Sequence, residues 1–170
     1  MRQWGRSLPQ GLSPWWPVIG RNKKSVGLDL RKPEGQALAR QLIAGADIVI
    51  ENFRPGAMEK WGLGYEALAK DNPRLIMARV SGFGQTGPYS QRAGYGLIGE
   101  AMGGLRYVTG EPDRAPARAG ISIGDSLAAM HSVMGILMAL HHRDRTGQGQ
   151  VIDAALYESV LAVMENLITE

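Results

Sequence analysis

Short apolar runs alternate with longer stretches of helical periodicity along most of the chain. The runs typical of β-strands cover residues 25–30, 47–51, 75–80 and 151–156. The helical stretches cover residues 33–45, 55–61, 65–70, 125–142 and 157–168. Because strands and helices alternate, this pattern predicts an α/β fold with a parallel sheet and flanking helices, in which residues 47–51 form a buried strand.

The first predicted helix carries signals at both ends. It begins with Pro33 followed by an acidic residue, the favoured order for a first turn, and Gly45 is placed to end it. Leu38, Leu42 and Ile43 are predicted to form its apolar stripe.

The helix predicted over residues 125–142 is apolar on nearly every side, which indicates a buried position. We interpret Met130, Met134 and Met138 as core-filling side chains. The longest apolar stretch, residues 127–140, has 14 residues, whereas a membrane-spanning helix needs about 20. We therefore expect a soluble, cytoplasmic protein that does not contact a membrane.

Residues 1–20 have no regular period. They are interrupted by Pro and Gly and contain Trp4, Trp15 and Trp16, without the pattern of a signal or transit peptide. We expect an irregular lead-in whose tryptophans pack on another part of the protein.

Composition narrows the chemistry further. Apolar residues make up 44% and charged residues 21% of the 170 residues, as in globular proteins. The absence of cysteine excludes disulfides, a thiolate nucleophile, an iron–sulfur cluster and a cysteine-ligated zinc. The histidines are His131 and the adjacent pair His141 and His142, which point about 100° apart on a helix, so we expect no metal site.

Positive charge is concentrated near the N-terminus, although the net charge is only +3. Residues 1–32 contain several Lys and Arg residues but a single acidic residue, Asp29. Such cations suit phosphate groups, and no aromatic residues interleave with them as in a nucleic-acid motif. A small phosphorylated ligand is favoured over nucleic acid, beside the alternative that these charges are only solvated.

Residues 82–87 read G-F-G-Q-T-G, the spacing of a dinucleotide-binding loop that follows a strand. That fingerprint needs its third glycine in an opening helix, but Pro88 follows and the next helical period begins near Tyr95. We therefore interpret these residues as a glycine-rich loop near a functional site, and not as a binding site for a nicotinamide dinucleotide.

Asp125 stands at the start of the longest predicted helix. Local sequence favours an N-cap, where Asp accepts a backbone N–H and complements the helix dipole. The same position also suits a covalent nucleophile, because helix N–H groups keep a carboxylate ionised and stabilise an oxyanion forming on it. The two interpretations are compatible.

Several segments in order share a family pattern. They are residues 21–30 (R-N-K-K-S-V-G-L-D-L), 51–56 (E-N-F-R-P-G), 62–65 (G-L-G-Y), 72–76 (N-P-R-L-I), 81–89 (S-G-F-G-Q-T-G-P-Y), 109–112 (T-G-E-P) and 145–150 (R-T-G-Q-G-Q). Over residues 21–170 the chain thereby resembles the class III coenzyme A transferases, which include formyl-CoA transferase, the carnitine CoA-transferases and α-methylacyl-CoA racemase.

The resemblance implies a Rossmann-like large domain, of which residues 21–170 would be a part without the first βα unit and the small domain. It implies an interlocked homodimer when full length, acyl-CoA and a small carboxylic acid as partners, and coenzyme A as substrate with no cofactor. Asp125 would be the catalytic aspartate, forming an aspartyl anhydride and then an aspartyl-CoA thioester. The positions matching CoA-binding residues are Leu28, Arg31, Asn52, Phe53, Arg54, Lys60 and Tyr95.

Two departures keep alternatives open. The family commonly has an acid where this chain has Gly96, and the racemase branch has G-H-D where this chain has Gly94, Tyr95 and Gly96. Without that histidine for proton transfer, an isomerase is the less favoured alternative. Family members are also much longer, so a catalytically inactive fragment is the other alternative.

Overall fold

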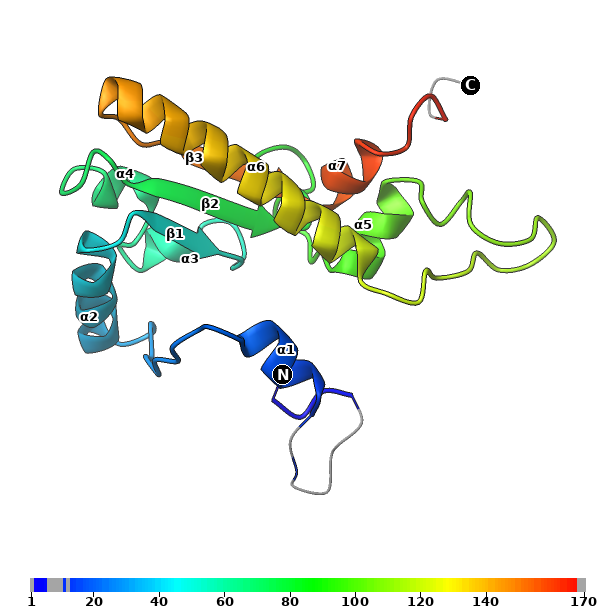
Figure 1. Cartoon of the computed structure of the whole chain (residues 1–170), viewed down its shortest axis with the longest axis horizontal. Coiled ribbons are helices and arrows are strands. Elements are labelled where there is room, and N and C mark those ends of the chain that lie inside the picture. The colour runs from blue at the N-terminus through cyan, green and yellow to red at the C-terminus, as the bar shows by residue number, and fades with distance from the viewer. Residues whose placement is uncertain (1, 6–10, 12, 168–170) are drawn as a thin grey trace.

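A three-stranded parallel sheet forms the centre of the chain (Figure 1). The computed structural model describes residues 2–5, 11 and 13–167. The strands are β1 (Ile48–Glu51), β2 (Ile76–Ser81) and β3 (Val151–Ala155), in the order β1-β2-β3. Both pairings are parallel. The α/β fold and the parallel sheet predicted from the sequence are therefore confirmed.

One face of the sheet is covered by α2 (Pro33–Ala44), α3 (Ala57–Lys60) and α4 (Tyr65–Leu68). Their buried side chains pack against β2 in one cluster, which contains Ala39, Met58, Leu63, Leu68, Leu75 and Met77. These local helices were predicted, and this cluster fixes them beneath the sheet.

The apolar stripe predicted for α2 is wrong. Leu38 and Leu42 are exposed, whereas Gly35 and Ala39 are buried. Gly35 lies against the backbone of Asp29, where a Cβ atom would be 2.8 Å from the carbonyl carbon. The backbone of Asp29 can come this close to α2 only on the side of the helix that carries small residues.

The other face of the sheet is covered by α6 (Ile123–Thr146). Ile76 and Ala78 of β2 pack against Ile136 and Ala139 of α6. In Figure 1 the N-terminal half of α6 extends past the end of β2, where α5 (Gly96–Met102) and α7 (Leu156–Leu161) lie. These three helices contact one another and form a second packed region beside the sheet.

The burial predicted for the longest helix is wrong on one side. Met130, Met134 and Met138 are exposed, Met138 with 65% of its surface, because the sheet covers only the side that carries Ile136 and Ala139. By length and composition alone α6 is apolar enough to cross a membrane, a test that a core helix of a soluble protein also passes. On β1, too, burial is only partial, since Ile50 is exposed.

The strand predicted over residues 25–30 is absent. Residues 23–29 have no regular structure, while Leu28 and Leu30 pack against the cluster beneath the sheet. The alternating pattern therefore reflects two leucines that face the core and not a hydrogen-bonded strand.

Both ends of the chain also differ from the prediction. Within residues 1–20, expected to be irregular, α1 (Trp15–Gly20) forms, and the ring of Trp15 lies 5.4 Å from that of Trp4. These tryptophans thus pack partly on each other. The helix predicted over residues 157–168 ends at Leu161 and continues as turns; Ile168 lies outside the described residues.

Candidate active site

The carboxyl ends of the parallel strands lie at one edge of the sheet, where α5, α6 and α7 also begin (Figure 1). In open α/β sheets this edge is where ligands bind, because the loops that follow the strands converge there. The loop after β1 carries residues 52–56, and the loop after β2 carries residues 82–94. Most of the residues expected at the site belong to these loops or to the helices that follow them.

Three of the expected CoA-binding residues follow β1 directly. Asn52, Phe53 and Arg54 are exposed, and the Phe53 ring packs edge-on against Trp61 with 5.0 Å between ring centroids. Because Trp61 follows Lys60 at the end of α3, the exposed Lys60 lies close to the same surface. Asn52, Phe53 and Arg54 thus form one exposed segment whose aromatic ring packs on Trp61, the neighbour of Lys60 in the chain.

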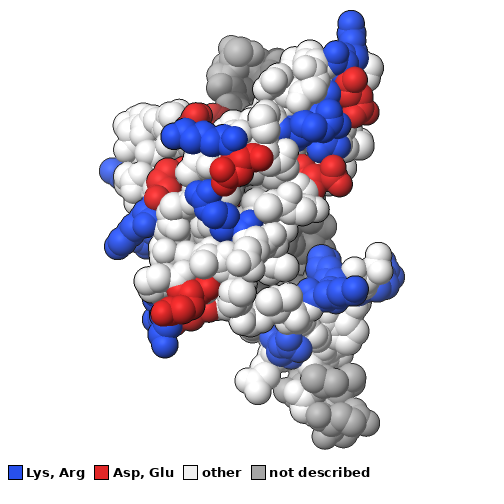
Figure 2. Space-filling model, turned by 90° about the vertical axis from the view of Figure 1, so that its left-hand side faces the viewer, with Lys and Arg blue, Asp and Glu red and all other residues white. Residues whose placement is uncertain are grey.

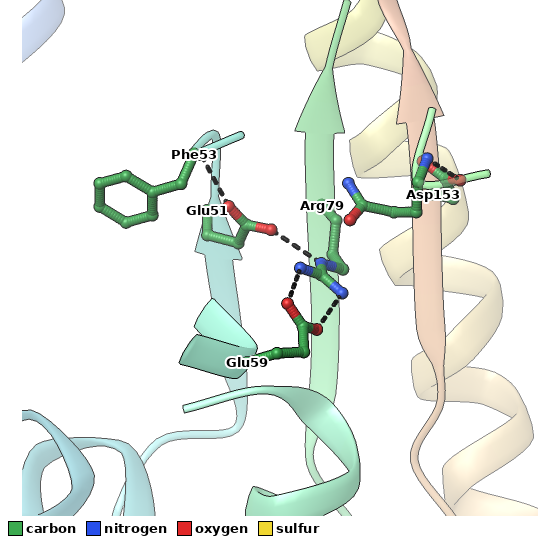
Figure 3. Close-up of polar contacts among 6 residues, drawn as sticks. Glu51, Phe53, Glu59, Arg79 and Asp153 are labelled. Atoms are coloured by element: carbon green, nitrogen blue, oxygen red, sulfur yellow. Dashed lines mark hydrogen bonds and ion pairs between the residues drawn. The ribbon is translucent and has the colours of Figure 1, made fainter. Parts of the chain in front are cut away.

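A buried ion-pair network anchors this loop (Figure 3). The Arg79 Nε atom donates to Glu51 Oε1 at 2.7 Å, and the Phe53 backbone N–H donates to Glu51 Oε2 at 2.7 Å. Arg79 also donates to both carboxylate oxygens of Glu59, at 2.6 and 3.1 Å. Burial by itself lowers the pKa of Arg79, but the hydrogen bonds to Glu59 and Glu51 outweigh it and raise that pKa. The guanidinium therefore stays charged between the two carboxylates.

Leu28 and Arg31 lie before α2. Leu28 is half-buried and packs against the cluster of α2, α3 and α4 side chains that Trp61 also contacts. Arg31 is exposed and pairs with Asp29, with 2.8 Å between Nε and Oδ1. Within the described part of the chain, Arg31 forms an ion pair with Asp29 and with no residue of the loop after β1.

The glycine loop after β2 folds back on itself. The backbones of Gly82 and Gly94 touch, at a place where neither has room for a Cβ atom. Asp153 of β3 accepts the Gln85 backbone N–H at 2.8 Å, a contact also drawn in Figure 3. No helix opens at Gly87, and the next one, α5, begins at Gly96. The loop therefore lacks the helix that a dinucleotide-binding fingerprint requires.

Asp125 lies in the first turn of α6, but it is not the N-cap predicted from the sequence. The helix begins at Ile123 and its N-cap residue is Ser122. The Asp125 carboxylate lies instead against Gly96, the first residue of α5, where an added Cβ atom would be 2.9 Å from Asp125 Cγ. Tyr95 is the N-cap residue of α5 and directly precedes Gly96, and its side chain is exposed.

The surroundings of Asp125 raise the pKa of its carboxyl. Burial raises the pKa of the Asp125 carboxyl, nearby Glu100 raises it further, and Arg118 opposes them. Glu100 is 1% exposed, its Oε1 accepts the Gly124 backbone N–H at 3.5 Å, and within the described residues its Oε2 has no hydrogen-bond partner. Asp125 is therefore an exposed residue whose carboxyl ionises less readily than usual, because partial desolvation and a second carboxyl oppose its charge.

The sequence matches the family profile described as CoA-transferase family III over residues 1–170. This chain belongs to CoA-transferase family III. It is 62% identical over 170 residues to a protein of Chloroflexus aurantiacus named succinyl-CoA–D-citramalate CoA-transferase, covering all of this chain and 42% of that protein. It is 45% identical over 152 residues to the succinate–glutarate CoA-transferase of Agrobacterium fabrum, covering 89% of this chain and 38% of that protein.

Solved structures of the family have the same fold. A CAIB/BAIF family protein from Brucella suis superposes with a TM-score of 0.91 at 42% identity, covering 99% of this chain and 46% of that one. This family III chain thus spans about two fifths of the length of the curated relatives it matches, 42% for the first of them.

Sequence reasoning missed Glu100 and the network of Glu51, Glu59 and Arg79. Glu100 follows Gly96 by one helical turn, so the helical period was the signal that could have placed it near the site. The pairing of Glu51 with Arg79 depends on the register between β1 and β2, which no local pattern specifies. Within the described residues no group of three or more His, Asp or Glu is arranged to hold a metal ion.

Proposed function

We propose that this chain forms part of an enzyme that transfers coenzyme A from an acyl-CoA to a carboxylic acid, with Asp125 as the nucleophile. The observation that carries the proposal is the Asp125 carboxylate itself, which lies against Gly96 where α5 and α6 begin, in a chain of CoA-transferase family III. The first turn of a helix favours an ionised carboxylate, whereas partial desolvation and Glu100 raise the pKa of Asp125. The ionised form is the nucleophile.

The transfer proceeds in steps that exchange acyl bonds at Asp125. The carboxylate attacks the thioester carbonyl, CoA thiolate leaves, and an aspartyl–acyl anhydride forms. The thiolate then attacks the aspartyl carbonyl, which gives an aspartyl-CoA thioester and releases the donor acid. The acceptor carboxylate attacks that thioester, and the thiolate freed in this step attacks the acceptor acyl carbonyl and regenerates Asp125. Each step replaces one activated acyl bond by another, so no further energy source is needed provided that water is excluded.

The surface around Phe53 suits the CoA molecule. Arg54 and Lys60 are exposed cations for its phosphates, and the exposed side of the Phe53 ring is available for stacking on adenine. Arg31, Leu28, Asn52 and Tyr95 complete the set that we propose to contact CoA. We propose no additional cofactor.

Succinyl-CoA is the donor that we propose to test first. Several relatives that match this chain are named for succinyl-CoA or succinate with D-citramalate, L-malate, glutarate or mesaconate as the second acid. Each of these names contains succinyl-CoA or succinate, and each second acid is a dicarboxylic acid. We propose D-citramalate as the first acceptor because the relative named for it is 62% identical.

Hydroxylamine trapping tests the covalent step. The chain is mixed with succinyl-CoA and hydroxylamine, which captures activated carboxyl groups, and the hydroxamate is located by peptide mass spectrometry. We expect a succinyl-CoA-dependent hydroxamate on Asp125, its loss in Asp125→Asn, and its retention in Asp144→Asn, the same substitution at the exposed far end of α6. A folded chain that binds CoA and forms no hydroxamate would refute Asp125 as the nucleophile.

A further inference from the structure

We propose that Glu51 is a positioning residue for CoA binding. Its carboxylate, which is held in place by Arg79, keeps the backbone of residues 52–54 in the conformation that binds CoA. Glu51 is the last residue of β1 and is 5% exposed. Its carboxylate uses one oxygen for Arg79 and the other for the Phe53 backbone N–H, each at 2.7 Å (Figure 3). One side chain thus connects the rigid sheet to the first turn of the loop.

Arg79 holds the Glu51 carboxylate in place from the sheet. It lies on the central strand β2, paired in register with Glu51, and its exposure is only 8%. The two remaining guanidinium nitrogens are held by Glu59 on α3, at 2.6 and 3.1 Å. A planar guanidinium bound by two carboxylates has little freedom to rotate. The position of the Glu51 carboxylate is fixed in turn.

These contacts hold residues 52–54 in one backbone conformation. The Phe53 N–H points inward to Glu51, while the Phe53 ring packs on Trp61 and the flanking Asn52 and Arg54 are exposed. A loop that is ordered before the ligand arrives loses less conformational entropy on binding. This inference rests on the proposed function, because it takes residues 52–54 to contact CoA.

The same network also joins α3 to the sheet, so a purely structural role must be separated from a positioning role. Glu59 provides the matched control, because it pairs with Arg79 but its interaction with the loop after β1 is with the Gly56 backbone at the end of that loop, away from residues 52–54. Glu51→Gln keeps the size of the side chain but replaces one acceptor oxygen by a donor, so it cannot accept from both Arg79 and Phe53. Glu59→Gln weakens the other side of Arg79 and leaves the contact to Phe53 intact.

Two measurements on the full chain decide the proposal. The first is hydrogen exchange of the Phe53 amide by NMR, and the second is the dissociation constant for free coenzyme A by calorimetry. In the unaltered chain we expect a protected Phe53 amide. In Glu51→Gln we expect faster exchange there and CoA affinity weakened about tenfold, the effect of losing one charge-assisted hydrogen bond. In Glu59→Gln we expect both quantities to stay within about twofold of the unaltered chain.

The outcomes distinguish a failure of the positioning role of Glu51 from a failure of the proposed function. Equal CoA dissociation constants in the two variants would overturn the positioning role and leave the proposed function standing. A Phe53 amide that exchanges freely in the unaltered chain would overturn it too, without relying on any variant. An unaltered chain with a protected Phe53 amide and no affinity for CoA would refute the proposed function, and the positioning role with it.

Discussion

Replacing Gly96 with alanine would displace the Asp125 carboxylate without changing its chemistry. The methyl group would lie 2.9 Å from Asp125 Cγ and 3.0 Å from Oδ1, and closer still to Oδ2. Gly96 does not have a positive φ, so its backbone accepts alanine without strain. The three atoms nearest to that methyl group all belong to the Asp125 carboxylate, which can rotate away.

The size of the displacement follows from ordinary contact distances. Carbon atoms in contact lie about 3.5–4.0 Å apart, so the carboxyl group must move by about 1 Å. A misplacement of about 1 Å at a reacting group can slow a reaction by about 100-fold. We expect the succinyl-CoA-dependent hydroxamate on Asp125 to form about 100-fold more slowly in Gly96→Ala.

The assay compares initial rates of hydroxamate formation at saturating succinyl-CoA, together with CoA affinity and urea unfolding. Gly120→Ala is the matched control, because it lies shortly before α6, has no positive φ, and a Cβ atom there meets nothing within 4 Å. We expect unchanged rates in this control. In both variants the free energy of unfolding should change by less than about 1 kcal/mol.

An unchanged hydroxamate rate in Gly96→Ala would refute the argument that Asp125 must stay against Gly96 to react. A rate loss that is matched by a loss of CoA affinity or stability would refute it equally, because the damage would then extend beyond the carboxylate.

Three further predictions concern the site and the core. Removing the Glu100 charge (Glu100→Gln) should lower the raised pKa of Asp125 and shift the rise of hydroxamate formation with pH to lower pH, because the ionised carboxylate is the nucleophile; an unshifted pH profile would contradict the coupling. The pKa of Asp125 in the folded chain lies above the ordinary value of an aspartate, so the stability it contributes is lost as pH rises through the folded-state pKa. This loss should be smaller in Glu100→Gln, as measured by urea unfolding across pH. Arg54→Ala should weaken CoA binding several-fold in calorimetry, with the difference shrinking at high salt because exposed charges are screened; a salt-independent difference would argue against a phosphate contact. Ile76→Ala, fully buried between the sheet and α6, should cost about 2–5 kcal/mol in urea unfolding, whereas Ile50→Ala on the exposed side of β1 should cost less than about 1 kcal/mol; similar costs would contradict the assignment of the core.

The strands and the early helices could be predicted because their signals are local. The apolar runs of β1, β2 and β3 are short and bounded by turn residues, and Pro33 and Gly45 mark the ends of α2. The ordered family motifs likewise predicted the family from the sequence. Asp125 was correctly expected at the start of the long helix, although the N-cap is Ser122.

Which side of a helix is buried depended on what packs against it. The two leucines predicted to face the core on α2 are exposed, because the close approach of Asp29 admits only the side that carries Gly35. On α6 all sides are apolar, so the sequence pattern does not distinguish the side against the sheet from the side that carries Met134. The leucines at positions 28 and 30 alternate like a strand, yet a strand forms only where a neighbour supplies hydrogen bonds, and none does there.

The sequence by itself determined the strand order along the chain, the family and the aspartate at the helix start, because each is carried by residues close together in sequence. Only the tertiary structure decided what surrounds that aspartate and what holds the loop after β1. Gly96 and Glu100 reach Asp125 through the packing of α5 on α6, and Glu51 meets Arg79 through strand register. Such contacts join residues far apart along the chain, and their geometry depends on the packing of the whole sheet and its helices.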